Sequence, residues 1–195
     1  MLCSSLATAS TSALTVRCCC SEDLAMADGE LVVRPCCADD AAGLAEMYAL
    51  DRDEIEDAEP WRAPRFFEVN GQLDRITRVW TEHRTLGFVA VQRERIVGLF
   101  ILEGVTSESA TVGYYVASAH RREGVATRGL ALLIGIAFRD VGIRRLVADI
   151  RPDNLGSRRV AEHNGFRYEK SVLVEGVEYD RLVLSHDHLF EHPRQ

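Results

Sequence analysis

The sequence from residue 110 to residue 166 places a phosphate-binding corner in the middle of the chain. A strand pattern, ATVGYYV, is followed by a short loop and by the string RREGVA, residues 121–126, which opens a helix. The first backbone N–H groups of a helix have no intrahelical acceptor and lie at the positive end of the helix dipole, so they bind phosphate well. Gly124 and Ala126 keep side chains small where a phosphate would approach. The sequence therefore predicts a phosphorylated cofactor held at a strand–loop–helix corner.

Length, charge and missing motifs limit the alternatives. The 195 residues suffice for one domain with a full core, and no run approaches the ~20 apolar residues of a membrane helix. The net charge of −7 argues against nucleic acid as the main partner. The chain has neither the GxxxxGKS/T motif of P-loop proteins nor a GxGxxG motif followed by an acid. We therefore expect neither a P-loop nucleotide nor a dinucleotide, and neither a nucleic-acid nor a membrane partner.

Residues 1–28 differ in composition from the rest of the chain. They are rich in Ser, Thr, Ala and Cys, with no acid before Glu22. Three interpretations stay open: a disordered tail, an upstream extension with Met26 as the natural start, and an organellar transit peptide. All six cysteines occur by Cys37, which suits a reducing compartment rather than a disulfide-stapled fold. We expect a cytoplasmic protein, or an organellar one if residues 1–28 are a transit peptide.

Hydrophobic periodicity predicts one α/β domain over residues 29–186, followed by a C-terminal tail over residues 187–195. Residues 51–64 are expected to be a loop, either an acidic rim near an amine substrate or a solvated segment, because they hold two prolines and many acids. Helices are predicted at 41–48, 66–84, 124–140 and 154–165, the first capped by Asp39 or Asp40, and strands at 31–34, 86–92, 96–103, 110–116, 146–150, 171–174 and 179–185. The expected architecture is a mixed central sheet of about seven strands flanked by about four helices.

The run from residue 113 to residue 166 resembles the GNAT superfamily of acetyl-CoA-dependent N-acetyltransferases. The segment GYYV-ASAH-RREGVAT is similar to the G-Y-W/Y-V strand, His-containing loop and pyrophosphate signature of its ribosomal-protein-alanine acetyltransferase (RimJ/RimL-type) group. DNLGSRRVAEHNGF matches that group's D-N-x-x-S-x-x-V/L-x-E-x-x-G-F, and RFFEVNGQ and VEGVEYDRLVL look like its flanking segments. The resemblance covers about residues 30–186 and implies a single-domain GNAT fold.

The resemblance implies acetyl-CoA as the co-substrate. Tyr115 and Val116 would flank the thioester and pantetheine through their backbone, because the strand leaves its neighbour there. Asn154 would hydrogen-bond the pantetheine arm, and its alternative role as a helix cap is compatible with that contact. The implied pyrophosphate cradle comprises Arg121, Arg122, Glu123, Gly124, Val125, Ala126 and Thr127.

Two positions that serve proton transfer in many superfamily members are altered here. The Tyr seven residues after the motif's Asn is replaced by Ala161, and the Glu that relatives often place on the strand is replaced by Thr111. Ser157 is our candidate for a cofactor contact and for the acid that protonates the thiolate, or else a serine that helps its helix begin. Glu103 is the candidate base, or else a solvated acid at a strand end.

The acceptor implied by the resemblance is a primary amine that attacks directly in a ternary complex. A protein N-terminus, such as that of a ribosomal protein, is favoured, because an α-amino group with a pKa near ~8 needs less help than a lysine with a pKa near ~10. The alternatives are a small amine, such as an aminated antibiotic or polyamine, and an acyl-CoA-binding module without catalysis. The sequence leaves the oligomeric state open, a homodimer included.

Three other features carry weaker predictions. His120 could contact phosphate or order its loop, and Asp180 could orient substrate or pair with an arginine. Cys18-Cys19-Cys20 lacks the CxxC spacing of zinc sites, and the His-rich segment from residue 186 lies in a tail, so we predict no metal.

Overall fold

The computed structural model describes residues 25–58 and 64–187. One eight-stranded mixed sheet forms its centre, with the strand order β1-β2-β3-β4-β5-β6-β8-β7. Neighbouring strands are antiparallel except β5 and β6, which are parallel. The strands are Met26–Asp28 (β1), Leu31–Pro35 (β2), Leu86–Gln92 (β3), Arg95–Glu103 (β4), Ser109–Val116 (β5), Arg145–Ile150 (β6), Arg167–Val174 (β7) and Val177–Ser185 (β8).

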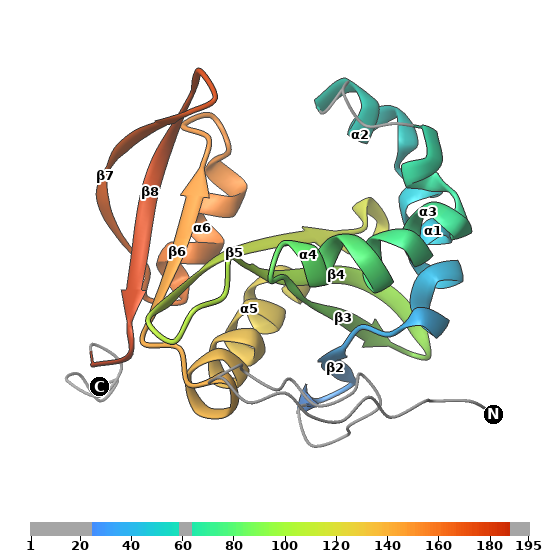
Figure 1. Ribbon diagram of the computed structural model, residues 1–195, viewed down its shortest axis with the longest axis horizontal. Helices are drawn as coiled ribbons and strands as arrows, with labels where there is room; N and C mark the ends of the chain where they lie inside the picture. Colours follow the sequence, from blue (N-terminus) through green and yellow to red (C-terminus); the bar gives the residue numbers. More distant parts are fainter. Residues whose placement is uncertain (1–24, 59–63, 188–195) are drawn as a thin grey trace.

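Helices cover both faces of this sheet (Figure 1). The α-helices are Ala41–Leu50 (α1), Arg52–Ala58 (α2), Val69–Asp74 (α3), Trp80–Glu82 (α4), Val125–Gly135 (α5) and Leu155–His163 (α6). Shorter elements are the 3₁₀ turns Ala38–Asp40 (η2), Pro64–Phe67 (η3) and Ser118–His120 (η5) and the π-helical turns Arg75–Val79 (η4) and Ile136–Val141 (η6). Within the described ranges, no helix has both the length and the apolar character needed to cross a membrane.

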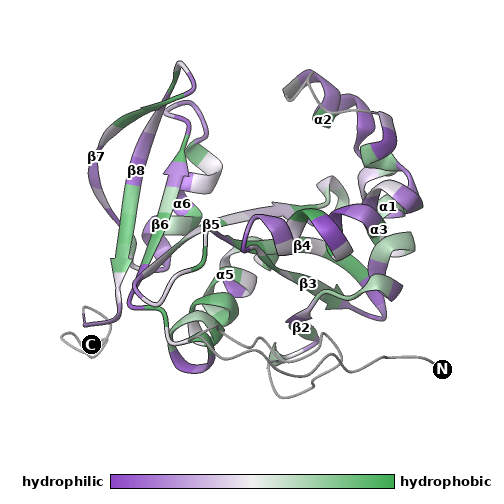
Figure 2. Cartoon of the chain, viewed as in Figure 1, coloured by the Kyte–Doolittle hydropathy of each residue, from purple (hydrophilic) through white to green (hydrophobic). Residues whose placement is uncertain are grey.

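The core has two parts, one on each face of the central strands. Phe88 and Ala90 of β3 belong to the cluster that contains the apolar residues of α5, whereas Val89 belongs to the cluster that contains those of α1. Successive side chains of a strand point to opposite faces, so a strand covered on both faces is apolar at consecutive positions. Figure 2 shows this as hydrophobic colour along β4 and α5 and hydrophilic colour along α2.

The sheet splits between its two parallel strands. β5 and β6 pair only from Ser109↔Arg145 to Thr111↔Val147. β5 nevertheless continues to Val116 and β6 to Ile150. Beyond Thr111 the two strands diverge, so the edge of β5 that faces β6 loses its partner (Figure 1). The half formed by β6, β8 and β7 thus lies apart from the half formed by β1 to β5, and the split positions the candidate site.

The prediction of a loop over residues 51–64 is wrong for its first part. Residues 52–58 form α2, with Asp53 and Glu54 in the first turn. Carboxylates there are stabilised by the helix dipole, and the first proline comes only at Pro60. The acids of this segment therefore belong to the start of a helix, and its prolines come after the end of that helix. Residues 59–63 lie outside the described part of the chain.

The predicted α/β fold with a mixed central sheet is confirmed, with eight strands instead of about seven. The additional strand is β1, a three-residue segment too short to show a periodic pattern. It pairs with β2 although the predicted domain boundary was residue 29. The predicted helix over 66–84 is divided into η3, α3, η4 and α4. Residues 1–24 lie outside the described ranges, so the domain boundaries stay predictions.

Candidate active site

A cavity of about 690 Å³ opens where β5 and β6 diverge. Every residue predicted to bind the cofactor lines it, except Glu123. The structure therefore brings together segments that the sequence treats separately: the end of β5, the start of α5 and the start of α6. The lining residues are Tyr48, Glu54, Ile55, Phe66, Tyr114, Tyr115, Val116, His120, Arg121, Arg122, Gly124, Val125, Ala126, Thr127, Asn154, Gly156, Ser157 and Val160.

The start of α5 borders this cavity with unpaired backbone N–H groups. Gly124 caps the helix in the left-handed conformation, with φ of 77° and ψ of 5°. The first amide to bond within this turn is that of Arg128, which donates to the Gly124 carbonyl over 3.0 Å. Among the hydrogen bonds of the described residues, none occupies the N–H of Gly124, Val125 or Ala126. These amides are available to an anion at the positive end of α5.

Glu123 does not line the cavity but contacts His120, which does. The Glu123 carboxylate lies 3.4 Å from His120 Nδ1. The predicted roles for His120 were phosphate contact or loop ordering, and this contact favours the second.

The start of α6 forms the opposite wall. The Asn154 side-chain oxygen accepts a hydrogen bond from the Ser157 N–H over 3.0 Å, which is the predicted helix cap. Its amide nitrogen has no partner among the residues that the structure describes, so the cap leaves a donor for a ligand. The Ser157 hydroxyl is likewise unpaired within the described ranges and lines the cavity. Ala161 of α6 is fully buried and contributes to the core.

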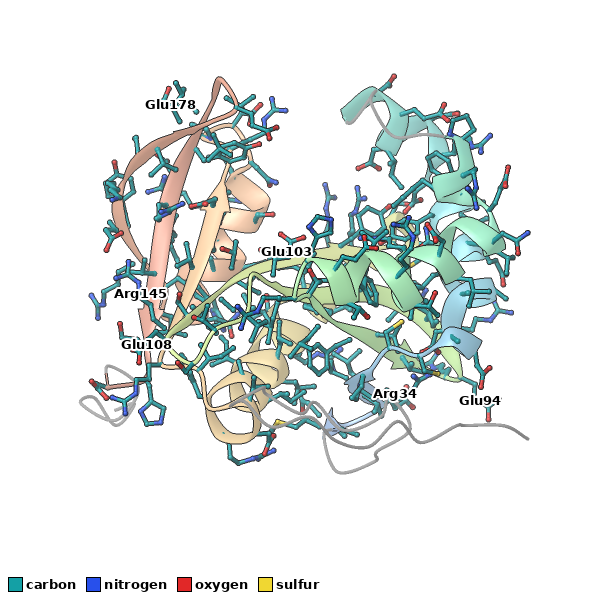
Figure 3. All side chains as sticks on the ribbon, viewed as in Figure 1. Arg34, Glu94, Glu103, Glu108, Arg145 and Glu178 are labelled. Atoms are coloured by element: carbon teal, nitrogen blue, oxygen red, sulfur yellow. The ribbon has the colours of Figure 1, made fainter. Side chains whose placement is uncertain are left out.

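Glu103 does not line the cavity, and its side chain is exposed at the end of β4. It pairs with Thr111 across the β4–β5 ladder. Residues directly opposite one another point to the same face, with Cβ atoms ~5 Å apart. The Glu103 carboxylate therefore lies on the same face as Thr111, the last residue of β5 that pairs with β6. Figure 3 shows Glu103 between the two halves of the molecule.

Arg121 joins the cavity wall to α2. Its guanidinium donates to Glu54 over 2.5 Å and to the Val116 carbonyl over 3.2 Å, and it lies 5.8 Å from the centre of the Tyr115 ring. Exposed ion pairs add little stability, so this contact matters for geometry more than for folding. It brings the end of β5, the cradle and α2 together around the cavity.

Asp51, the residue between α1 and α2, is a site residue that no sequence pattern indicates. Its buried carboxylate accepts hydrogen bonds from the Tyr115 hydroxyl and from both the N–H and the hydroxyl of Ser118. It was one of several acids in a segment interpreted as a loop. Its partners lie 64 and 67 positions away along the chain, so no local pattern could single it out.

Two further predictions concern charged groups outside the cavity. Asp180 accepts a hydrogen bond from Arg158 over 2.6 Å, so the arginine partner is observed. In the described ranges there is no group of three or more His, Cys, Asp or Glu side chains able to hold a metal ion. Residues 188–195, which include two of the histidines considered earlier, lie outside those ranges.

The structure is a single α/β domain whose mixed sheet splits beside the start of α5, where backbone N–H groups are unpaired within the described residues. Residues 30–167 match the acetyltransferase (GNAT) domain, and the chain belongs to this family. The chain is 31% identical over 151 residues to the probable N-acetyltransferase YjcK of Bacillus subtilis, an alignment of 71% of this chain and 83% of the relative. The predicted family membership is confirmed.

Solved structures share the fold. The ribosomal-protein-S5-alanine acetyltransferase from Vibrio fischeri superposes with a TM-score of 0.75 and 22% identity, over 84% of this chain and 97% of that chain. RimJ of Mycobacterium smegmatis in complex with CoA-disulfide gives 0.68 and 27%, over 83% and 84%. The aminoglycoside acetyltransferase AAC(6')-Ib in complex with ribostamycin and coenzyme A gives 0.70 and 16%, over 85% and 99%. The fold is thus shared by enzymes named for protein and for antibiotic acceptors.

Proposed function

We propose that this acetyltransferase moves an acetyl group from acetyl-CoA to the α-amine of a protein N-terminus. The observation that carries the proposal is the gathering of the cradle, the free edge of β5 and the start of α6 around one cavity. Each of these segments offers hydrogen-bonding groups that the protein itself leaves unused. A cofactor with a diphosphate at one end and an amide-rich arm ending in a thioester matches that series of groups.

The cofactor is placed by backbone more than by side chains. The N–H groups of Gly124, Val125 and Ala126 bind the diphosphate at the start of α5. The pantetheine arm lies along the part of β5 beyond Thr111, where backbone groups facing β6 lack a strand partner. The Asn154 amide nitrogen donates to the arm from the opposite wall. These contacts hold the thioester near Ser157.

The acceptor end of the cavity favours a substrate with a single amine. Its walls include Tyr48, Ile55 and Phe66, and the Tyr48 ring lies 4.6 Å from Phe66 and 5.2 Å from Tyr115. Glu54 is the one carboxylate among the lining residues of the described chain, and Arg121 already pairs with it. An antibiotic with several ammonium groups would need several unpaired carboxylates. An N-terminal residue presents one amine next to a side chain that aromatic walls can bury.

The reaction needs a neutral nucleophile and a protonated leaving group. The amine nitrogen attacks the thioester carbon and forms a tetrahedral oxyanion, which collapses with cleavage of the C–S bond. Ser157 supplies a proton to the departing thiolate, and Glu103, through water, accepts one from the amine. An α-amine, with a pKa near ~8, is partly neutral before any base acts.

Thiol release from acetyl-CoA tests the proposal. The acceptors are a peptide with a free N-terminus and no lysine, the same peptide with a blocked N-terminus and one lysine, a polyamine and an aminoglycoside. We expect turnover with the first peptide at least tenfold faster than with the others, and a mass increase of one acetyl group at its N-terminus. Faster turnover with a small amine would contradict the acceptor assignment. Saturable acetyl-CoA binding without turnover on any amine would instead favour a binding module.

A further inference from the structure

Asp51 lies outside the cavity but holds Tyr115, which lines it, and Ser118, which lies in the loop before the cradle. Asp51 is only 7% exposed. The carboxylate accepts hydrogen bonds from the Tyr115 hydroxyl, from the Ser118 N–H over 2.7 Å and from the Ser118 hydroxyl. Three donors from the end of β5 and the loop that follows it thus converge on one side chain at the junction of α1 and α2.

The carboxylate is ionised at neutral pH. Burial by itself raises the pKa of Asp51, but the hydrogen bonds from Ser118 and Tyr115 outweigh it and lower that pKa below its ordinary value. Hydrogen bonds to an ionised group are shorter and stronger than those between neutral groups. The donors are therefore held closely around a fixed negative charge.

The hydrogen bond from the Tyr115 hydroxyl to Asp51 holds Tyr115 between the part of the cavity proposed for acetyl-CoA and the part proposed for the amine. The Tyr115 backbone belongs to the free part of β5 beyond Thr111, and its ring packs 5.2 Å from the Tyr48 ring. Arg121 covers the same ring at 5.8 Å. With its hydroxyl bonded to Asp51, the side chain cannot move to another χ1 rotamer without breaking a charged hydrogen bond. The aromatic side chains proposed to face the amine and the part of β5 proposed to face the thioester are consequently held in a fixed relative position.

The second donor fixes where the cradle begins. Ser118 starts η5, and its carbonyl accepts a hydrogen bond from the Arg121 N–H over 3.2 Å. The position of Ser118 therefore sets the position of the residues that lead into Gly124. A carboxylate that holds both Tyr115 and Ser118 fixes the spacing between the thioester end and the diphosphate end of the cofactor.

We infer that Asp51 is a positioning residue for acetyl transfer, which acts through Tyr115 and Ser118 on the alignment of the thioester with the incoming amine. The inference rests on the proposed binding of acetyl-CoA in this cavity. A small displacement of a bound thioester is enough to matter, because a misplacement of ~1 Å can cost ~100-fold in rate. Asp51 itself touches neither substrate.

The test compares Asp51→Asn with the matched surface variant Asp53→Asn. Asp53 is an exposed carboxylate in the first turn of α2, two residues further along the chain. Asp51→Asn removes the negative charge, so the Tyr115 hydroxyl and the Ser118 N–H lose an ionised acceptor, and the Ser118 hydroxyl must reverse its hydrogen bond wherever it faces the new amide nitrogen. We expect kcat per cofactor-binding site, counted by calorimetric titration with CoA, to fall at least ~10-fold, with KM for the acceptor changed less than ~3-fold. Asp53→Asn should match the wild type.

A double-mutant cycle separates positioning from general destabilisation. Asp51→Asn weakens the hydrogen bond that Tyr115→Phe removes, so their combined effect on kcat should be smaller than the product of the single effects. If Asp51→Asn does not fold, Ser118→Ala takes its place in the cycle, because it removes one hydroxyl bond and leaves the N–H bond intact. We expect Ser118→Ala and Tyr115→Phe each to lower kcat per site by ~3-fold or more.

The inference is overturned if Asp51→Asn lowers only the melting temperature and keeps kcat per site within twofold of the wild type. Unchanged kcat in both Ser118→Ala and Tyr115→Phe overturns it equally. Failure of the proposed function has a different signature, because the wild-type protein itself would then release no thiol from acetyl-CoA with any amine.

Discussion

The Tyr114 hydroxyl donates a hydrogen bond to the Ser157 carbonyl over 3.1 Å and so joins β5 to the first turn of α6 across the split in the sheet. Burial raises the pKa of Tyr114, so this hydroxyl stays protonated and remains a donor. Its ring stacks on Phe100 with the ring centres 5.8 Å apart. One side chain thereby links the core under β5 to the wall that carries Asn154 and Ser157.

Removing the Tyr114 hydroxyl should let α6 move away from β5 without leaving a void in the hydrophobic core. In Tyr114→Phe the ring keeps its stacking partner, and the loss of one hydrogen bond should cost about 1 kcal/mol of unfolding free energy. If the same free energy is lost from the complex with CoA, the affinity for CoA should fall about fivefold. Urea denaturation and calorimetric titration measure the two effects. Tyr168→Phe is the control, since Tyr168 has an exposed hydroxyl contact with Ser171. Equal CoA affinity in both variants would contradict a role for Tyr114 in holding α6.

The cradle can be tested with two glycines that share one backbone conformation. Gly124 begins α5 with φ of 77°, and Gly142 follows η6 with φ of 78°. A glutamate at either position should cost about 1–2 kcal/mol of stability through backbone strain. Only Gly124→Glu also places a negative charge beside the proposed diphosphate site, so it should abolish CoA binding, whereas Gly142→Glu should bind as the wild type does. Loss of binding in both variants would mean that strain alone explains the effect.

The cradle could be predicted from the sequence because every residue in it is local. RREGVA follows a strand pattern and a four-residue loop and precedes a long apolar stripe, and the start of a helix depends only on such neighbours. Asn154 was predicted for the same reason, since a cap and its Ser157 partner are three positions apart. The resemblance to a known family then joined these pieces into one expected site.

Contacts between distant segments could not be predicted in this way. Tyr114 and Ser157 are 43 positions apart, and Asp51 and Ser118 are 67 apart. Neither pair leaves a periodic or spacing signal, because only the packing of α1 and α6 on the sheet brings them together. α2 was missed for a different reason, since a seven-residue helix with acids in its first turn has the composition of a loop. Which segments meet around the cavity could therefore be learned only from the structure.

Ser157 should matter for turnover more than for binding. Its hydroxyl has no partner among the described residues, so Ser157→Ala should leave the melting temperature unchanged. Loss of an acid for the thiolate should lower kcat by at least about tenfold, with KM for acetyl-CoA nearly constant. Steady-state kinetics with the N-terminal peptide measures both constants, and the exposed Ser107→Ala is the matched control. A Ser157→Ala enzyme working at full rate would remove this hydroxyl from the mechanism.

Buried Asp40 should make stability depend on pH in the acidic range. Burial by itself raises the pKa of Asp40. Two hydrogen bonds from Arg34, over 2.8 and 2.7 Å, and one from the Cys37 N–H outweigh burial and bring this pKa below its ordinary value. A lowered folded-state pKa adds stability above the unfolded pKa of ~3.9 and loses it as the pH falls through the folded value. Asp40→Asn should therefore cost about 2 kcal/mol at pH 7 and much less near pH 3. Urea denaturation at both pH values measures this, with Asp74→Asn as an exposed ion-pair control. An equal loss at both pH values would show that the side chain acts by shape and not by charge.

Glu103 can be tested through the pH dependence of the rate. A base that removes a proton from the amine is needed while the amine is protonated, and it loses importance above the amine's own pKa of ~8. Glu103→Gln should therefore lower kcat/KM by about tenfold at pH 7 and by less than about twofold at pH 9.5 with the N-terminal peptide. Glu108→Gln, in the exposed loop that follows β4, serves as the control. Figure 3 shows that Glu108 lies away from Glu103, near the base of β6 and β8. If Glu103→Gln shows the same rate ratio at both pH values, or no loss at pH 7, the base must come from water or from the acceptor itself.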